Sequence, residues 1–286
     1  MVNYIDPKLL DLTLIPSNIK ISTISATCSL GTNFMLNEIY KYFKLDISKI
    51  FTVKYAGKIK SLEQQKNKKK KRKSFQNQMT VEIKPDLLDY PDSKVSVKIF
   101  RNGSIQMSGI KSILAVNNIF TKLISEMKKQ YGIIENGKMI DINFVEDIDS
   151  LQVSKFKIDM INSGFQLDYQ VNRENLYNKL LENKMECKFE PSIHAGVNIK
   201  FLPTGSKKIV SIFVFESGNI IITGAKSSDN ILESYEYISD YMKKNKDIIQ
   251  KSKICNMLRN NISNEIKDML KIDDNDDLLA LALSEC

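Results

Sequence analysis

Residues 210–226 read VSIFVFESGNIIITGAK, and residues 95–111 read VSVKIFRNGSIQMSGIK. Each stretch begins with a run in which every second residue is apolar, followed by a turn dipeptide, Asn102-Gly103 or Ser217-Gly218. A second run rich in apolar residues follows, and each stretch ends with Ser/Thr-Gly-x-Lys. Alternation with a period of two predicts β-strands, and a Gly-bearing dipeptide between two such runs is a strong hairpin signal. The chain is therefore expected to contain the same hairpin twice.

Helical patterns flank both hairpins. A short helix and a strand-like stretch are expected before each one, with the helices at residues 34–44 and 172–183 and the strands at 21–29 and 157–167. Apolar residues at spacings of three, four and seven predict a longer amphipathic helix after each hairpin. They are Leu114, Ile119, Phe120, Leu123, Ile124 and Met127 in the first helix, and Ile231, Tyr235, Ile238 and Met242 in the second.

This internal repeat predicts the division of the chain. The repeated unit is a strand, a helix, several antiparallel strands and a long helix. We expect an N-terminal arm at 1–17, a first repeat at 18–130 with a basic insertion at about 58–74, a linker at 131–155, a second repeat at 156–250 and a C-terminal helical and acidic tail at 251–286.

The positive charge is concentrated in one segment. The formal net charge is +8, and Lys66–Lys73 alone carries seven positive charges. Such a segment attracts phosphate or another polyanion. Two roles stay open for it: a solvated loop that also serves as a nuclear import signal, or a direct contact to DNA.

The remaining composition excludes several classes of protein. No apolar run is long enough for a membrane span, and the first 20 residues lack the apolar core of a secretory signal. The four cysteines are far apart and form no metal-binding pair, so free thiols in a reducing, intracellular compartment are expected. They are Cys28, Cys187, Cys255 and Cys286. We expect no metal and no cofactor.

The two repeats resemble the conserved core of TATA-box-binding proteins. The signature Ser-Gly-x-x-x-x-Thr-Gly-Ala-Lys is intact at Ser217–Lys226, whereas Ser108 and Ile110 alter it in the first repeat. Residues 26–31 (ATCSLG) and 189–197 (FEPSIHAGV) are similar to two further family motifs. The resemblance implies an α+β, saddle-like fold, in which two intramolecular repeats form a curved ten-stranded antiparallel sheet with four helices on its convex face.

In this fold, one face of each strand packs on helices and the other faces DNA. The expected helix-facing residues are Val97, Ile99, Ile105, Met107, Ile212, Val214, Ile220 and Ile222. The opposite parity is polar in the first repeat and mainly apolar in the second, with Lys98, Phe100, Gln106 and Ser108 against Phe213, Phe215, Ile221 and Thr223. The two halves are therefore expected to hold DNA unequally.

The family inserts two aromatic wedges per repeat between base pairs, which kinks the duplex. By motif position, the wedges are Phe75, Phe100, His194 and Phe215. Imidazole buries less apolar surface than phenylalanine, so a shallower kink is expected at His194. The resemblance implies minor-groove contacts from Thr23, Ser25, Ser108, Phe213, Ile221 and Thr223, and phosphate contacts from Lys111, Lys200, Lys207, Lys208 and Lys226.

The centre of the DNA-facing surface departs from the family. Thr23 replaces one of the family's two central asparagines, and either Met160 or Asn162 occupies the place of the other. The sequence alone leaves this alternative open, so the DNA sequence preference is not fixed by the resemblance.

The resemblance implies partners and a setting as well as a ligand. The expected partners are A·T-rich promoter double-stranded DNA, a transcription factor IIB-like protein near Glu190 and the RNA polymerase machinery. The chain is expected to be a monomeric pseudo-dimer without membrane contact. Its expected location is the nucleus or another site of viral or genome transcription. The alternative is a scaffold of the same fold that has lost specific DNA bending. An enzyme is not expected, because His194 has no paired nucleophile or ligand in the sequence.

Overall fold

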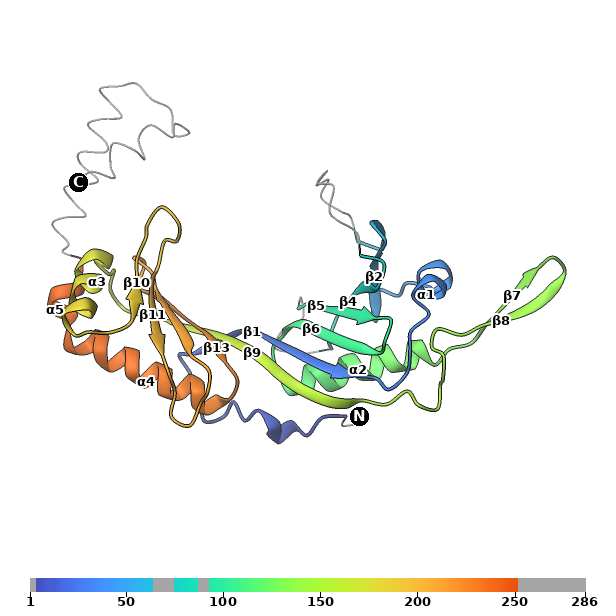
Figure 1. The fold of residues 1–286 in the computed structure, drawn as a ribbon, viewed down its shortest axis with the longest axis horizontal. Helices are drawn as coiled ribbons and strands as arrows, with labels where there is room; N and C mark the ends of the chain where they lie inside the picture. The colour runs from blue at the N-terminus through green and yellow to red at the C-terminus, as the bar shows by residue number, and fades with distance from the viewer. Residues whose placement is uncertain (1–3, 64–74, 87–92, 252–286) are drawn as a thin grey trace, which may run out of the picture. The chain divides into compact units, whose positions relative to one another are not determined.

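The computed structural model describes residues 4–63, 75–86 and 93–251 (Figure 1). The expected C-terminal tail after Lys251 and the Lys66–Lys73 segment lie outside these residues, as do Cys255 and Cys286. The chain divides into two compact units. Unit 1 contains the residues up to Phe165 with Leu202–Val210 and Ile221–Tyr235, and unit 2 contains Gln166–Phe201, Ser211–Ile220 and the described residues from Glu236 onward.

Unit 1 is built on a sheet in the order β13-β9-β1-β6-β5-β4-β2-β3. The registers recorded from β9 to β3 are antiparallel. The elements are β1 (Lys20–Ser29), α1 (Leu36–Tyr42), β2 (Ile50–Tyr55), β3 (Lys58–Ser61), β4 (Gln78–Ile83), β5 (Val95–Phe100), β6 (Ser104–Ile110), α2 (Ile113–Met127), β7 (Tyr131–Glu135), β8 (Lys138–Ile142) and β9 (Ser154–Gln166).

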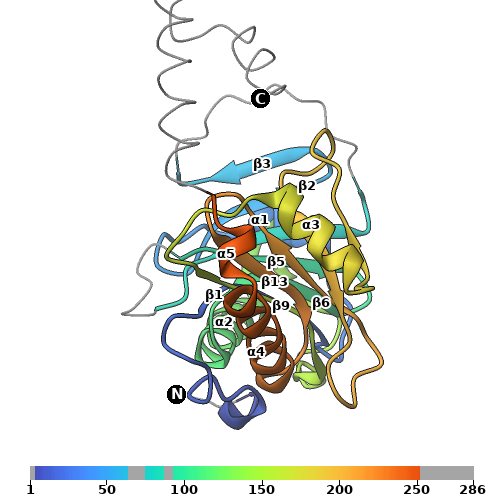
Figure 2. The same cartoon turned by 90° about the vertical axis from the view of Figure 1, so that its left-hand side faces the viewer.

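Unit 2 contains strands in the order β10-β11-β12-β13, of which β12 and β13 also have residues in unit 1. Its short helices α3 and α5 contact each other and are seen together in Figure 2. The elements are α3 (Arg173–Glu182), β10 (Cys187–Lys188), β11 (Val197–Phe201), β12 (Val210–Val214), β13 (Asn219–Ala225), α4 (Ser228–Lys244) and α5 (Lys246–Ile249). Helix α4 also begins in unit 1, because its residues up to Tyr235 belong there.

Both sequence-predicted hairpins are confirmed, and their turns have the same geometry. Gly103 and Gly218 each have φ of 83°, a left-handed conformation that glycine adopts without strain. A Cβ atom would lie 2.4 Å from the carbonyl oxygen of Thr32 at the first turn and of Tyr169 at the second. Both turns therefore require glycine, because the backbone that follows the first strand of each repeat leaves no room for a Cβ atom at Gly103 or Gly218.

The predicted helix-facing residues of both hairpins are buried. Each of them is at most 1% exposed: Val97, Ile99, Ile105, Met107, Ile212, Val214, Ile220 and Ile222. The predicted stripe on α2 is confirmed except at its start. Leu114 is 49% exposed, while Ile113 and Val116 are buried, because the stripe begins one position away from the predicted one.

The buried amine of Lys122 also fixes α2 within unit 1. Its Nζ donates to the carbonyl oxygens of Ser48 and Lys84, at 2.6 and 2.7 Å, and to the carboxylate of Asp86 at 2.7 Å. This side chain is 10% exposed. A buried ammonium requires such partners, so Lys122 joins the helix to two loops of the sheet.

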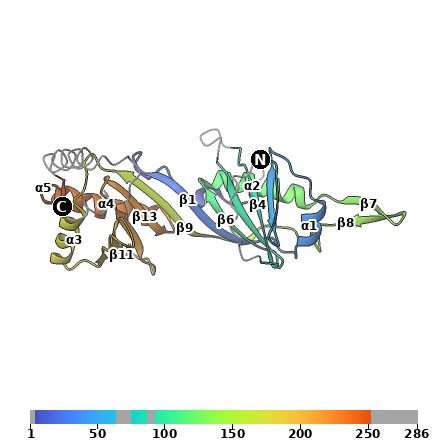
Figure 3. The same ribbon diagram turned by 90° about the horizontal axis from the view of Figure 1, so that it is seen from above.

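The expected linker is more ordered than a connection. It begins with the antiparallel hairpin β7–β8, which turns at Asn136-Gly137 with φ of 52° and 76°. Figure 3 shows this hairpin extending from the part of unit 1 that carries α1. The chain then returns to α1, where Val145 bridges Phe34 and the amide of Met35 donates to the carbonyl oxygen of Phe144.

Two further differences concern the ends of the predicted parts. The basic insertion, expected from about residue 58, begins with β3, which pairs with β2 and brings the strands named in the two sheet orders to eleven instead of ten. The N-terminal arm contains a 3-10 turn, η1 (Pro7–Leu9), and packs on α2. There the amide of Ile5 donates to Oδ1 of Asn117 at 2.8 Å. The α+β class and the antiparallel sheet are confirmed.

Candidate nucleic-acid interface

Unit 2 brings three of the predicted DNA-facing rings together. The ring centroid of His194 lies 4.8 Å from that of Phe213 and 5.7 Å from that of Phe215. Phe213 lies on β12 and Phe215 directly follows it, so both rings face the same side of the strand. We call His194, Phe213 and Phe215 the aromatic cluster. Ile193 beside it is 78% exposed.

Two hydrogen bonds hold the segment that carries the imidazole of this cluster. The carbonyl oxygen of Glu190 accepts from the amide of His194 at 2.9 Å, which closes a turn. The amide of Gly196 donates to Nδ1 of His194 at 3.0 Å, so Nδ1 acts as an acceptor in this geometry. A Cβ at Gly196 would lie 3.2 Å from Cε1 of Phe215. The missing side chain at Gly196 therefore leaves room for the ring.

An ion-pair network joins the His194 loop to the β12–β13 turn. The guanidinium of Arg173, at the start of α3, donates to the carbonyl oxygen of Ala195 at 2.7 Å and to the carboxylate of Glu216 at 2.8 Å. Glu216 also pairs with Lys251 at 2.5 Å. The sequence analysis missed Arg173, because a contact across 43 residues leaves no local pattern.

The aromatic candidates of unit 1 are arranged differently. Phe75 is 65% exposed and precedes β4. Phe100 ends β5, is half-buried and lies opposite Gln78 in the register of β4 and β5. The strand face next to Phe100 is polar, since Lys98 on β5, two positions before Phe100, forms a cross-strand pair with Gln106 on β6. Unit 1 thus presents two separate rings beside polar side chains.

The central part of unit 1 answers the question left open at Met160 and Asn162. In the register of β1 and β9, Thr23 pairs with Asn162 and Ser25 pairs with Met160. Met160 and Asn162 are two positions apart on β9 and both are half-buried, so both belong to the face that carries Thr223. The hydroxyl of Thr223 donates to Oδ1 of Asn162 at 2.5 Å.

The other predicted minor-groove residues lie on strands of the same sheet. Ser108 is exposed on β6 and pairs with Ser25 on β1. Ile221 is half-buried and stands two positions before Thr223 on β13. Because side chains two positions apart on a strand point to the same side, Ile221 and Thr223 share one face of β13.

Three lysines of unit 1 gather near the end of β13. The pKa of Lys226 is below its ordinary value of 10.5, first because its ammonium is partly desolvated and then because Lys208 and Lys157 lie close to it. Asp159 opposes this effect only in part. Mutual repulsion among cations favours an anion beside them. Lys157 was not predicted, although its charge at the start of β9 was visible in the sequence.

The remaining phosphate candidates already have protein partners or lie in the exposed β11–β12 loop. The amine of Lys200 donates to Oγ of Ser211 at 2.7 Å, within unit 2. The amine of Lys111 donates to the carbonyl oxygen of Ser22. Lys207 is exposed. Of the five predicted phosphate contacts, only Lys208 and Lys226 have a recorded interaction with each other among the described residues.

The comparison with known proteins identifies the family. The model of the family described as "Transcription factor TFIID (or TATA-binding protein, TBP)" matches residues 155–245. The chain is also 37% identical over 251 residues to the "TATA-box-binding protein-like" protein of Acanthamoeba polyphaga mimivirus, across 79% of this chain and 66% of that protein. This chain is a divergent member of the TATA-box-binding protein family.

Cellular relatives of the family match over shorter stretches. The TATA-box-binding protein of Pyrococcus horikoshii is 25% identical over 145 residues, and that of Pyrodictium occultum is 27% identical over 173 residues. These matches cover 51% and 58% of this chain, and 63% and 74% of the relatives. The solved structure of Methanococcus jannaschii TBP aligns with a TM-score of 0.49 and 22% identity, over 79% of this chain and 99% of that chain.

The TATA-box-binding protein family is described as a family of transcription factors, which agrees with the expectation that the chain is not an enzyme.

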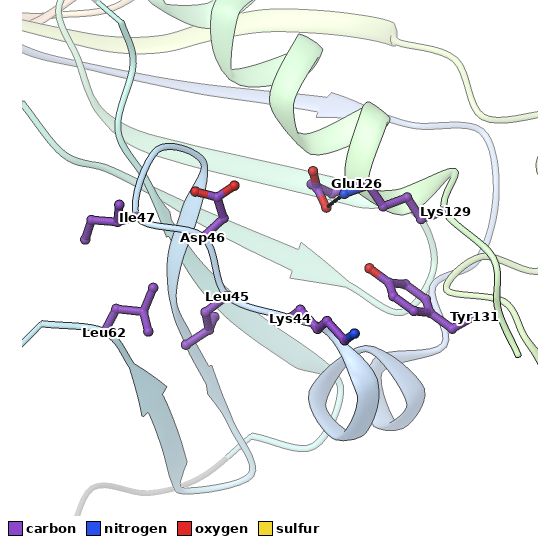
Figure 4. A pocket seen from close by; sticks show the side chains of 8 residues that line it. All are labelled: Lys44, Leu45, Asp46, Ile47, Leu62, Glu126, Lys129 and Tyr131. Carbon is purple, nitrogen blue, oxygen red and sulfur yellow. Dashed lines mark hydrogen bonds and ion pairs between the residues drawn. The ribbon is translucent and has the colours of Figure 1, made fainter. Parts of the chain in front are cut away.

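A pocket of about 560 Å³ in unit 1 contains none of the predicted site residues (Figure 4). It is lined by Lys44, Leu45, Asp46, Ile47, Leu62, Glu126, Lys129 and Tyr131. The buried carboxylate of Glu126 pairs there with Lys129 at 2.6 Å and with Lys49 at 2.7 Å, so it is already neutralised.

Residues 4–63, 75–86 and 93–251 contain no group of three or more His, Cys, Asp or Glu side chains that could hold a metal ion. None of the helices in these residues combines the length and the apolar character of a membrane span. Cys28 and Cys187 are free thiols, and burial raises the pKa of Cys28 to about 12.

Proposed function

We propose that the chain is a transcription initiation factor that binds A·T-rich promoter DNA through the minor groove and bends it. The observation that carries the proposal is the aromatic cluster. Motif position assigns His194 and Phe215 to the rings that insert between base pairs, and the ion pair of Arg173 with Glu216 and its hydrogen bond to Ala195 connect the segments that carry them. Unstacking a base step costs about a few kcal/mol, so rings that insert must be held in place before DNA arrives.

Two further features support DNA as the ligand. The cluster of Lys157, Lys208 and Lys226 offers positive charge to a phosphate, which adds a sequence-independent and salt-dependent contribution. The face with Thr223 and Asn162 offers hydroxyl and amide groups to the minor groove. Asymmetry is part of the proposal: unit 2 offers clustered rings, whereas the face of unit 1 is polar.

The test is fluorescence anisotropy with two end-labelled duplexes, one containing TATA and one rich in G·C, at two salt concentrations. End-to-end energy transfer on the same duplexes reports bending. We expect A·T-selective binding with bending, and loss of bending in the Phe100→Ala/Phe215→Ala double variant. The matched control is Phe201→Leu, a change of an aromatic residue on β11 whose ring stacks on Tyr237. Equal binding of both duplexes without bending would contradict the proposal.

The second candidate function is a scaffold in transcription complex assembly. Lys98 and Gln106 favour it, because a polar face gains less from a flattened minor groove than an apolar one does. Binding of a transcription factor IIB-like protein near the exposed Glu190 belongs to both candidates. Unbent, salt-sensitive DNA binding together with retained binding of the IIB-like protein would favour the scaffold. The monomeric state and a place in the nucleus or at a viral transcription site are proposals of the same standing.

A further inference from the structure

Two side-chain pairs at the centre of unit 1 differ in their chemistry. Thr23 and Asn162 form one cross-strand pair of β1 and β9, and Ser25 and Met160 form the next. All four side chains are half-buried, while the intervening Ile24 is buried on the other face. We call the first the donor pair and the second the thioether pair, for reasons that follow from their hydrogen bonds.

In the donor pair, protein groups already engage the acceptor atoms. Oδ1 of Asn162 accepts from the hydroxyl of Thr223 at 2.5 Å, and Oγ1 of Thr23 accepts from the amide of Gly109 at 3.0 Å. An amide side chain carries two N–H donors, and a threonine hydroxyl carries one. Among the described residues, no acceptor is recorded for the amide hydrogens of Asn162 or for the hydroxyl hydrogen of Thr23, so the pair can present donors to a ligand.

The thioether pair has different groups at the equivalent place. Met160 carries no donor, and its sulfur is a weak acceptor that lies 3.6 Å from Oγ1 of Thr223. The hydroxyl of Ser25 can donate or accept. This pair can therefore face a donor or an acceptor without leaving a polar group unpaired.

The minor groove separates these two cases. An A·T base pair presents only acceptors there, whereas G·C adds the N2 amino group of guanine, which is a donor. We infer that the donor pair rejects G·C at one of the two central base pairs and that the thioether pair accepts either base pair at the other. The inference rests on the proposed minor-groove binding. Its consequence is a preferred direction of the protein on DNA.

The test uses an A·T-only site that reads the same on both strands. With one central G·C pair the protein turns round and places that pair against Ser25 and Met160, so affinity falls by about twofold at most. With both central pairs changed to G·C, affinity falls by about tenfold or more. Inosine–cytosine at both positions restores affinity, because inosine lacks the N2 amino group.

Three variants separate this reading from a general loss of binding. Met160→Asn makes a single central G·C pair cost about tenfold, because both pairs then present donors. Thr223→Val frees Oδ1 of Asn162 to accept from guanine, so the cost of two G·C pairs decreases. Thr27→Val, on the same face of β1, is the control that leaves the G·C cost unchanged. Circular dichroism and thermal melting verify that each variant is folded.

Two outcomes overturn the inference alone. They are a single G·C pair that already costs tenfold in the unmodified protein, and two G·C pairs that cost no more than one; A·T preference elsewhere in the site would then still support the proposed function. Binding with no A·T preference at any position would instead contradict the proposed function and the inference with it.

Discussion

Gly196→Ala tests whether the aromatic cluster is packed as described. The new methyl group would lie 3.2 Å from Cε1 and 3.3 Å from Cδ1 and Cζ of Phe215, closer than the distance of about 3.5–4.0 Å at which carbon atoms attract. Gly196 does not have a positive φ, so the backbone accepts alanine. Overpacking lowers the free energy of unfolding by about 1–3 kcal/mol. Alanine offsets about 0.4–1 kcal/mol of this loss, because it restricts the unfolded chain more than glycine does.

The assay is urea denaturation of Gly196→Ala, Phe215→Leu and the double variant. Leucine removes the ring that the methyl group would meet, so the double variant should be more stable than the sum of the single effects, by about 0.5 kcal/mol or more. Energy transfer on end-labelled DNA should show reduced bending for Gly196→Ala, because displacing Phe215 also disturbs His194. Strictly additive stabilities with unchanged bending would refute the reasoning.

Three further predictions concern single residues. The depressed pKa of Lys226 means that its charged form disfavours folding; the cost is complete at neutral pH and disappears as the pH rises towards 10.5. Lys226→Gln should therefore raise Tm at pH 7 but not at high pH, while lowering the salt slope of DNA binding by about one; an unchanged slope would exclude a phosphate contact. Because the pKa of Cys28 is about 12, iodoacetamide at pH 8 should leave it unmodified in the folded protein, and peptide mapping that finds rapid modification would contradict its burial. Lys122→Met should lower the free energy of unfolding by about 2 kcal/mol, since the carbonyl oxygens of Ser48 and Lys84 and the carboxylate of Asp86 lose the charged amine to which they bind; urea denaturation measures this, and an unchanged midpoint would show that water replaces the amine.

The hairpins could be predicted because their signals are local. Alternation and the glycine turns at Gly103 and Gly218 lie within one short segment, and strand geometry then fixes which side chains are buried. The hairpin β7–β8 was missed although Asn136-Gly137 marks its turn, because the residues on either side come as apolar doublets and do not alternate. Ile134 and Met139 are accordingly 78% and 76% exposed.

The site was harder to predict where it depends on contacts between distant segments. Motif position suggested His194 and Phe215 as candidates, and the structure adds the ring contact between them. Arg173 could not be found in this way, because its interactions with Ala195 and Glu216 depend on the folded unit. The choice between Met160 and Asn162 also required the register of β9, which shows that both belong to the same face.

The return of the chain to α1 determines where the protein can be divided. Phe144 and Val145 are 0% and 1% exposed, and they pack on the first short helix although they follow the long helix by many residues. In unit 2, Gln250 bridges Val171 in the corresponding way. A fragment cut after residue 130 would therefore lose part of its own interior. The smallest excisable piece of the first half extends to at least residue 151, where Leu151 is still buried, so the segment between the halves belongs to the first of them.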